Sequence, residues 1–167
     1  MTGDALAIDV GWRPGLIGWT VAAHATYYAR DWGFPAVFES KVAREMAGFH
    51  DRYRPERDVA FSVSGDVGFL ATMTIDGSDP ALEPGLAHLR WFIVSDEARG
   101  MGLGWRLMRE ALGFLRQSGA KRCFLTTFEG LGSARTLYDR AGFRLASADT
   151  SMTWGRAVTE QRFELDL

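Results

Sequence analysis

The sequence predicts a mixed α/β domain in which helices flank a central, twisted, mixed sheet. Apolar runs of strand length and amphipathic stretches of helical period follow one another along the whole chain. In the middle, an apolar strand at 86–94 leads through a glycine-rich turn into an amphipathic helix at 103–117. The chain of 167 residues is 47% hydrophobic and 24% charged, which suits one globular core. We expect a single domain over residues 1–167, with about six or seven strands and about four helices.

The first half of the chain is rich in aromatic residues and ends in a hairpin. Residues 1–14 show little periodicity and are expected to form a turn or a short strand. The aromatic stretch at 24–32 is predicted to be a helix because Gly33 and Pro35 follow it. The turn at 64–66, Ser-Gly-Asp between two apolar runs, indicates a tight hairpin. The predicted elements are a strand at 16–22, helices at 24–32 and 37–53, and hairpin strands at 59–63 and 67–75.

The second half of the chain begins after a loop at 76–85 that contains two prolines. The helix at 103–117 carries a single apolar stripe, and the Ser118-Gly119 pair indicates its end. The chain closes on a segment at 162–167 in which apolar and polar residues alternate, as in a half-buried strand. The predicted elements are strands at 86–94, 122–127, 143–146 and 162–167, and helices at 103–117 and 131–140.

The charged residues are distributed unevenly along a chain of net charge −2. Residues 1–98 carry 8 basic and 14 acidic side chains, whereas residues 99–144 carry 9 basic and 3 acidic ones. The basic part begins at a loop with three glycines, Gly100, Gly102 and Gly104, at the start of a helix. The first backbone N–H groups of a helix have no partner within it, and the helix dipole adds positive potential there. A small polyanionic ligand is therefore the first hypothesis, and no sequence signature of a nucleic-acid-binding module accompanies the basic residues.

The sequence also argues against several other classes of protein. No apolar run reaches the 18 or so residues of a membrane span, and the start of the chain lacks the pattern of a signal peptide. The single Cys123 cannot form an intrachain disulfide, and its apolar surroundings indicate a buried strand residue rather than a nucleophile. No cluster has the spacing of a metal site. We expect a cytoplasmic protein without a metal.

Two motifs give the glycine loop a more specific meaning. The loop reads Arg-Gly-Met-Gly-Leu-Gly over residues 99–104, and a second segment reads Ala-Arg-Thr-Leu-Tyr-Asp-Arg-Ala-Gly-Phe over residues 134–143. In these two motifs, and in their order, the chain resembles the GNAT N-acetyltransferase superfamily. The resemblance implies the GNAT acyl-CoA N-acyltransferase fold and acetyl-CoA as co-substrate. The first motif is the family's acetyl-CoA signature.

A narrower likeness extends over nearly the whole chain. The segment Pro-Gly-Leu-Ile-Gly-Trp at 14–19, the aromatic first helix and the ending Gln-x-Phe-Glu-Leu at 161–165 are the residues that carry it. They resemble the acetyltransferase module that is often fused behind a MarR-type DNA-binding domain. No such regulatory domain is present in this sequence, so we expect a stand-alone copy.

The resemblance implies which residues hold acetyl-CoA. Backbone amides of Arg99, Gly100, Met101, Gly102, Leu103 and Gly104 would cradle the pyrophosphate. Ile93 and Val94 would bind the pantetheine amides through their backbone, where the family's fourth and fifth strands separate, and the amide of Ile93 or a neighbour would face the thioester oxygen. Arg106 and Arg109 are candidates for the 3′-phosphate or are simply solvated helix residues. Leu131 replaces a frequent family Asn, so Ser133 or Thr127 would make that cofactor contact instead.

Tyr138 is the leading catalytic candidate. In the family this tyrosine protonates the departing thiolate, which is the role of a general acid. The base is less defined. His88, eleven residues before Arg99, occupies the offset of the catalytic glutamate in one family branch, and Glu83 and Asp76 are alternatives. A packed aromatic residue and a core histidine are the structural alternatives for these two positions.

Aromatic residues of the first helices are expected to wall the acceptor site, where the family places it. An ammonium group could pair with Glu39 or Asp31 beside such a wall. Plain core packing is the alternative for each residue. The acceptor-site candidates are His24, Tyr27, Tyr28, Trp32, Phe34 and Glu39.

The function expected from these residues is transfer of an acetyl group from acetyl-CoA to a primary amine of a small molecule or peptide. The amine would attack directly in a ternary complex, because no residue resembles a covalent acyl carrier. The alternatives are a non-catalytic acetyl-CoA sensor of the same fold, and a nucleic-acid- or protein-binding domain that uses the basic half. We expect partners to be acetyl-CoA and an amine, with no nucleic acid and no membrane, and a homodimer is possible.

Overall fold

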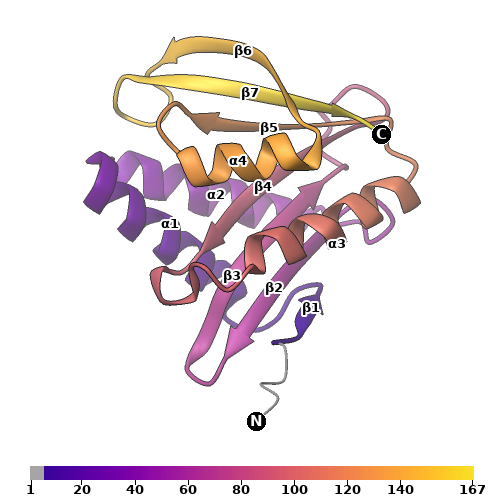
Figure 1. Ribbon diagram of the computed structural model, residues 1–167, viewed down its shortest axis with the longest axis horizontal. Helices are drawn as coiled ribbons and strands as arrows, with labels where there is room; N and C mark the ends of the chain where they lie inside the picture. Colours follow the sequence, from indigo (N-terminus) through magenta and orange to yellow (C-terminus); the bar gives the residue numbers. More distant parts are fainter. Residues whose placement is uncertain (1–5) are drawn as a thin grey trace.

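A seven-stranded sheet with the order β1-β2-β3-β4-β5-β7-β6 forms the centre of the computed structural model, which describes residues 6–167 (Figure 1). Strands β4 and β5 run parallel, and the other neighbouring strands of the described sheet are antiparallel. The predicted mixed sheet with four flanking α-helices is confirmed. The strands are β1 (Ile8–Val10), β2 (Val59–Gly65), β3 (Gly68–Asp76), β4 (Leu86–Val94), β5 (Arg122–Phe128), β6 (Arg144–Ser151) and β7 (Val158–Asp166). The helices are α1 (Leu16–Trp32), α2 (Ala36–Asp51), the short 3-10 turn η1 (Asp96–Ala98), α3 (Leu103–Gln117) and α4 (Gly132–Ala141).

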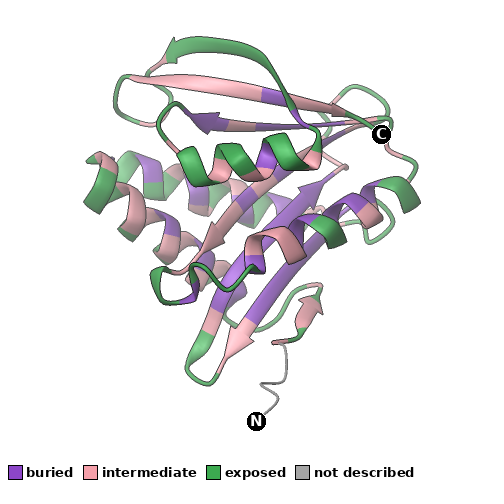
Figure 2. Ribbon diagram, in the orientation of Figure 1, coloured by how far each residue is buried: buried purple, intermediate pink, exposed green. Residues whose placement is uncertain are grey.

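The helices cover the sheet from both sides. Figure 1 shows α3 and α4 in front of the sheet and α1 and α2 behind it. On the α3 side, the predicted apolar stripe of the helix packs on β2 to β5 as one core. On the other side, aromatic residues of α1 and α2 pack on Trp91 and Phe128 as a second, smaller core. The central strands are buried while β6 at the edge is exposed along most of its length (Figure 2).

The prediction of a strand at 16–22 is wrong, because these residues form the first two turns of α1. The buried residues of the helix start, Leu16, Thr20 and His24, recur every fourth position, which is the period of a helix. A short apolar run is compatible with either structure, and here the left-handed Gly15 (φ 89°) begins a helix. The first strand is β1 instead, in the expected leader, where Ile8 pairs with Val63. The part of the leader at 1–5 lies outside the described residues.

The edge between β4 and β5 opens toward the start of α3. The two strands pair only over Leu86–His88 and Arg122–Phe124, after which β4 separates from β5. A register shift in the β3–β4 pair coincides with Trp91, whose φ of 48° is positive. A β-bulge of this kind bends a strand and changes the direction of its groups. The separation implied by the resemblance is therefore present, and it leaves one edge of β4 without a strand partner.

Candidate active site

The glycine loop 99–104 forms one wall of a cavity of about 730 Å³, which we name the loop cavity. The end of β4, the start of α4 and one face of α1 form its other walls. Of the residues at 93–94 and 99–104 that were predicted to hold the cofactor through their backbone, Met101 alone does not line this cavity, and its side chain is exposed. The predicted cofactor residues that line it are Ile93, Val94, Arg99, Gly100, Gly102, Leu103, Gly104 and Ser133.

The α3 end of the loop cavity has the features of an anion site. Gly102 precedes the helix with φ 74° and provides no side-chain cap, and Gly100 has φ 80°. A Cβ at either glycine would meet no atom within 4 Å, so their backbone borders open space. Uncapped N–H groups at a helix start attract negative charge. Gly104 lines the cavity and also allows close packing of α3 on β4, because a Cβ there would lie only 3.1 Å from Cζ of Phe92.

The arginines near the loop differ in their access to the loop cavity. Arg99 lines the cavity, pairs with Asp96 at 3.1 Å and lies 5.0 Å from the ring centre of Tyr27. Arg106 donates a hydrogen bond to the carbonyl of Leu6, and Arg109 is exposed. Because neither Arg106 nor Arg109 lines the loop cavity, Arg99 is the cation placed to meet a phosphate there.

A second cavity of about 260 Å³ lies beside the first, and we name it the aromatic cavity. Four residues line both cavities and mark their junction: Tyr28, Phe92, Thr127 and Tyr138. Two ligands that enter from the two cavities would therefore meet beside Tyr138. The further residues that line the aromatic cavity include His24, Phe38, Lys41, Val42, Glu45, His88, Arg90, Phe128, Trp154 and Glu160.

Helix α1 distributes its predicted acceptor residues between the two cavities. His24 lines the aromatic cavity, Tyr27 and Trp32 line the loop cavity, and Tyr28 lines both. Residues four apart share a helix face, which explains why His24 and Tyr28 point into the same cavity. Glu39 is exposed on α2 and lines neither cavity. The other residues singled out in this region are Asp31, exposed at the loop cavity, and Phe34, buried in the aromatic core.

Tyr138 and Tyr28 place two phenols at the junction of the cavities. Both side chains are largely buried, and burial raises the pKa of each phenol above its ordinary value of 10.0. Burial acts in this direction because a low-dielectric environment disfavours the charged phenolate. Both residues therefore keep their proton at neutral pH, as a proton donor must.

His88 is the histidine that was singled out as a candidate base. It lines the aromatic cavity and stacks on Phe124 with ring centres 4.1 Å apart. Burial, followed by the charges of Arg90, Arg162 and Lys41, lowers the pKa of His88 well below 6.5. Its imidazole is therefore neutral at pH 7 and has a lone pair available for a proton. The alternatives lie outside this cavity: Glu83 pairs with Arg122 at the surface, and Asp76 is buried between arginines.

His24 is the second neutral histidine of the aromatic cavity. Its Nδ1 lies 2.8 Å from the carbonyl oxygen of Thr20, one turn earlier, so Nδ1–H donates and Nε2 carries the lone pair. Burial lowers the pKa of His24 to about 4 from 6.5. As the pH falls, the unfolded chain therefore takes up a proton at this residue before the folded chain does.

The stability supplied by neutral His24 is thus present above pH 6.5 and is lost as the pH falls toward 4. The shift corresponds to about 3 kcal/mol of unfolding free energy. We expect His24→Gln to flatten this acid limb, measured as the free energy of unfolding in urea between pH 7 and pH 4. His50→Gln is the control, because His50 is only half-buried and should change the limb less. An unchanged limb in His24→Gln would contradict the assignment.

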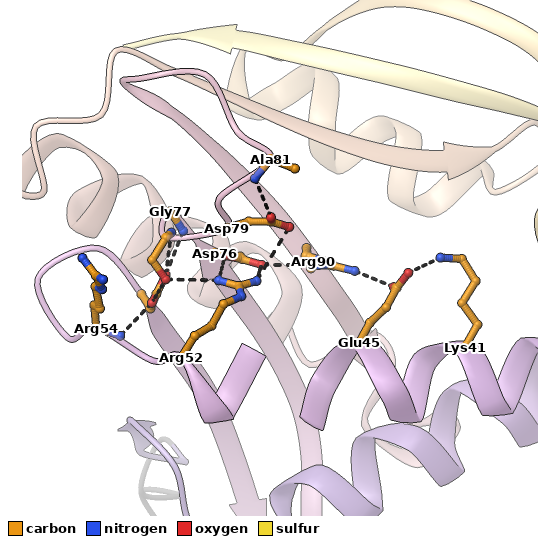
Figure 3. Close-up of polar contacts among 11 residues, drawn as sticks. Lys41, Glu45, Arg52, Arg54, Asp76, Gly77, Asp79, Ala81 and Arg90 are labelled. Carbon is orange, nitrogen blue, oxygen red and sulfur yellow. Dashed lines mark hydrogen bonds and ion pairs between the residues drawn. The ribbon is translucent and has the colours of Figure 1, made fainter. Parts of the chain in front are cut away.

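The charged residues of the aromatic cavity were not foreseen as site residues. Arg90 hydrogen-bonds Glu45 at 2.5 Å and pairs with Asp76 at 3.3 Å, while Lys41 pairs with the same Glu45 (Figure 3). Arg52 holds fully buried Asp76 with two hydrogen bonds of 2.6 and 2.8 Å. The network therefore extends from the base of the β3–β4 loop to the cavity wall. A charged residue within the apolar run 89–94 is the sequence signal that could have indicated it.

The β6–β7 loop at 152–157 supplies the outer wall of the aromatic cavity. Arg156 donates a hydrogen bond to the carbonyl of Trp32, which fastens the loop to the corner between α1 and α2. Trp154 packs on Phe38 and Phe128 with ring centres 5.6 and 5.2 Å away. Its Nε1–H donates to Glu160 at 2.5 Å. This wall joins residues more than a hundred positions apart, so periodicity within a segment could not reveal it.

Gly155 is the residue that lets this loop approach α2. A Cβ at Gly155 would lie 2.2 Å from Cγ1 of Val37 and 2.6 Å from Cγ of Pro35. We therefore expect Gly155→Ala to lower the unfolding free energy by about 1–3 kcal/mol, the usual cost of overpacking. Gly119→Ala separates this clash from backbone strain, because Gly119 has a similar φ of 76° and no atom near its Cβ position. Equal losses of stability in the two variants, measured by denaturant titration, would show that the loop does not press on α2.

Three further features bear on membrane contact, metal binding and thiol chemistry. Among residues 6–167, no helix is long and apolar enough to cross a membrane, and no group of three or more His, Cys, Asp or Glu side chains could hold a metal ion. Cys123 is buried in β5, and burial raises the pKa of its thiol to about 12. It lines neither cavity, so the expectation of a buried structural thiol is confirmed.

Comparison with solved structures finds the same fold in several acetyltransferases. A ribosomal-protein-alanine N-acetyltransferase from Brucella melitensis matches with a TM-score of 0.76 and 14% identity, covering 97% of this chain and 100% of the other. A Bacillus subtilis acetyltransferase in complex with CoA matches with a TM-score of 0.67 and 15% identity, covering 97% and 99%. A spermidine N-acetyltransferase from Vibrio cholerae matches with a TM-score of 0.68 and 14% identity, covering 96% and 95%. At these identities the likeness establishes the fold.

The family assignment comes from the sequence itself. No curated protein matches the chain. A family model described as the acetyltransferase (GNAT) family matches residues 23–143, which is most of the chain. The matched range includes both motifs and the strands β4 and β5, which line the two cavities. The chain therefore belongs to the GNAT acetyltransferase family.

Proposed function

We propose that this protein transfers an acetyl group from acetyl-CoA to a primary amine, by direct attack in a ternary complex. The observation that carries the proposal is the junction of the two cavities at Tyr28, Phe92, Thr127 and Tyr138. A donor in the loop cavity and an acceptor in the aromatic cavity would meet there without a covalent enzyme intermediate. Direct contact of two bound reactants is the main requirement of such a transfer.

The donor side is supported by backbone groups at two places. The uncapped start of α3 fits a pyrophosphate, and the free edge of β4 fits an extended amide chain. The N–H of Ser95 donates to Leu70 of β3 at 2.8 Å, so alternation directs the backbone groups of Ile93 toward β3. The groups of Phe92 and Val94 then face the opening left by β5. We therefore assign the thioester-facing amide to a neighbour of Ile93 rather than to Ile93 itself.

The proton transfers can be assigned to residues at the junction. When the amine nitrogen attacks the acetyl carbon and the carbon–sulfur bond breaks, Tyr138 donates its phenolic proton to the thiolate. An ammonium group has no lone pair, so the acceptor first loses one proton to solvent; His88, neutral in the aromatic cavity, then accepts the second proton, which the nitrogen loses once it has bonded to the acetyl carbon. We also propose that the chain is similar to the acetyltransferase module that is often fused behind MarR-type domains. Segment 14–19, which carries part of this likeness, forms the turn before α1 and the first residues of the helix.

The test is release of free CoA, followed with a thiol reagent, over a panel of primary amines. We expect CoA release above the acetyl-CoA hydrolysis background with at least one amine, together with an acetylated product of the correct mass. Binding of acetyl-CoA without release from any amine would reject the enzyme and would favour the sensor. The absence of acetyl-CoA binding would reject both.

A further inference from the structure

We infer that the acceptor enters the aromatic cavity as a small cationic amine with an apolar body and no carboxylate, and that Glu160 binds its ammonium group before the nitrogen loses a proton and attacks. The inference rests on the proposed function, because it assigns the chemistry of the amine that the aromatic cavity would take. Two independent observations carry it: the way in which charges are paired around the cavity, and the rings that surround the one carboxylate left over.

Four charged side chains line the aromatic cavity: Lys41, Glu45, Arg90 and Glu160. Lys41 and Arg90 both pair with Glu45, so the charge of this carboxylate is already offset by two cations. Glu160 forms no ion pair with any residue of the described chain, 6–167, and its one hydrogen bond there comes from Nε1 of Trp154. A carboxylate accepts up to about four hydrogen bonds, so most of its capacity remains open. A half-buried anion in this state favours a cation in the cavity.

The rings beside Glu160 favour the same ligand. Trp154 packs on Phe38 and Phe128, and Tyr28 lies 5.1 and 5.6 Å from these two rings. Aromatic faces attract ammonium groups and also bury an apolar body. The indole of Trp154 already attracts one cation, since Nζ of Lys41 lies 5.3 Å from its centre. The cavity volume of about 260 Å³ limits the acceptor to a small molecule or to one side chain.

Glu160 is held in place before any ligand arrives. It lies opposite Phe128 in the β5–β7 pair, and the hydrogen bond from Trp154 fixes its carboxylate. The loop that carries Trp154 is fastened to the α1–α2 corner through Arg156. An acceptor with a carboxylate of its own would add a third anion to this cavity, where Lys41 is already paired with Glu45 and Arg90 with both Glu45 and Asp76. The arrangement therefore selects against amino acids.

The test compares phenethylamine with phenylalanine, which share a ring and chain length and differ in the carboxylate. For the wild-type protein we expect kcat/KM to be at least about tenfold higher with phenethylamine. Glu160→Gln keeps the shape and can still accept the hydrogen bond from Trp154, but it loses the charge. We expect it to raise KM for phenethylamine by about ten- to a hundredfold, the usual effect of one charge-assisted hydrogen bond. KM for acetyl-CoA should stay unchanged.

Glu164→Gln is the matched control, because Glu164 lies on the same strand, outside the cavity, and pairs with Arg162 at 2.8 Å. If both variants give the same KM, or if phenylalanine is the better acceptor, the assignment of Glu160 is overturned. Calorimetry with phenethylamine and CoA separates this result from failure of the proposed function. Binding that Glu160→Gln weakens would uphold the anchor even if no acetyl group were transferred, and binding that the substitution leaves unchanged would reject it.

Discussion

Replacing Gly102 with Asp is expected to weaken acetyl-CoA binding more than about a hundredfold while the protein stays folded. Gly102 has φ 74°, a conformation that Asp tolerates better than most residues, and no atom lies within 4 Å of its Cβ position. The new carboxylate would therefore project into open space at the start of α3, where the proposal places the pyrophosphate. It would repel the phosphates and compete for the same N–H groups. Loss of two charge-assisted hydrogen bonds, each worth about 1.5–3 kcal/mol, accounts for an effect of this size.

Isothermal titration with acetyl-CoA measures the effect, and thermal melting checks the fold. Gly119→Asp is the matched control, because Gly119 also has a positive φ of 76° and an open Cβ position but lies beyond the other end of α3. It adds the same charge to the protein without approaching the loop cavity. If Gly102→Asp retained micromolar affinity, the pyrophosphate would have to bind elsewhere than at the start of α3.

The glycine loop and the helix that follows it could be predicted from the sequence, because their pattern is local. Helix α3 spans the predicted residues, since six buried apolar residues follow one helical period and glycines precede them. The loop follows closely after the end of β4, whereas α3 and β5 separate it from the start of α4. The separation of β4 from β5 was implied by the resemblance alone, because strand pairing is not encoded in the pattern of either strand. Gly104 is the local exception, since its packing against Phe92 joins two elements.

The walls of the aromatic cavity were predicted less well, because they depend on which face of each helix turns inward. On α2, the residues that line the aromatic cavity are Phe38, Lys41, Val42 and Glu45, at spacings of three, one and three. This is a helical stripe, and Glu39 lies off it. The apolar positions of α2 were identified in the sequence, but their phase was not extended to the charged residues between them. With that phase, Glu45 would have replaced Glu39 as the glutamate of α2 that lines the cavity.

The contribution of the β6–β7 loop could not be obtained from local pattern at all. Trp154 reaches the aromatic cavity because Gly155 packs against Val37 and Arg156 binds the carbonyl of Trp32. These contacts join segments more than a hundred residues apart, and each is made by a single side chain or by the absence of one. Only the packed structure brings them together.

Replacing Tyr138 with Phe is expected to lower kcat by about two to three orders of magnitude with little change in KM for acetyl-CoA. The ring would keep its packing against Phe143 and Phe163, whose centres lie 6.2 and 5.9 Å away, so the fold should not change. What is lost is the proton offered to the thiolate, and general acid catalysis typically contributes about 10²–10⁴. Turnover should be slowed rather than abolished, because a thiolate with a pKa near 8.5 leaves without full protonation.

Tyr28→Phe is the control that makes this result specific, because Tyr28 is the other phenol at the junction of the cavities. A larger loss of kcat in Tyr28→Phe than in Tyr138→Phe would transfer the role of proton donor to Tyr28. The pH dependence gives a second criterion. A general acid acts only while protonated, so activity falls as the pH rises through its pKa. Because burial raises the pKa of Tyr138 above 10.0, kcat should show no alkaline loss from this residue below about pH 10.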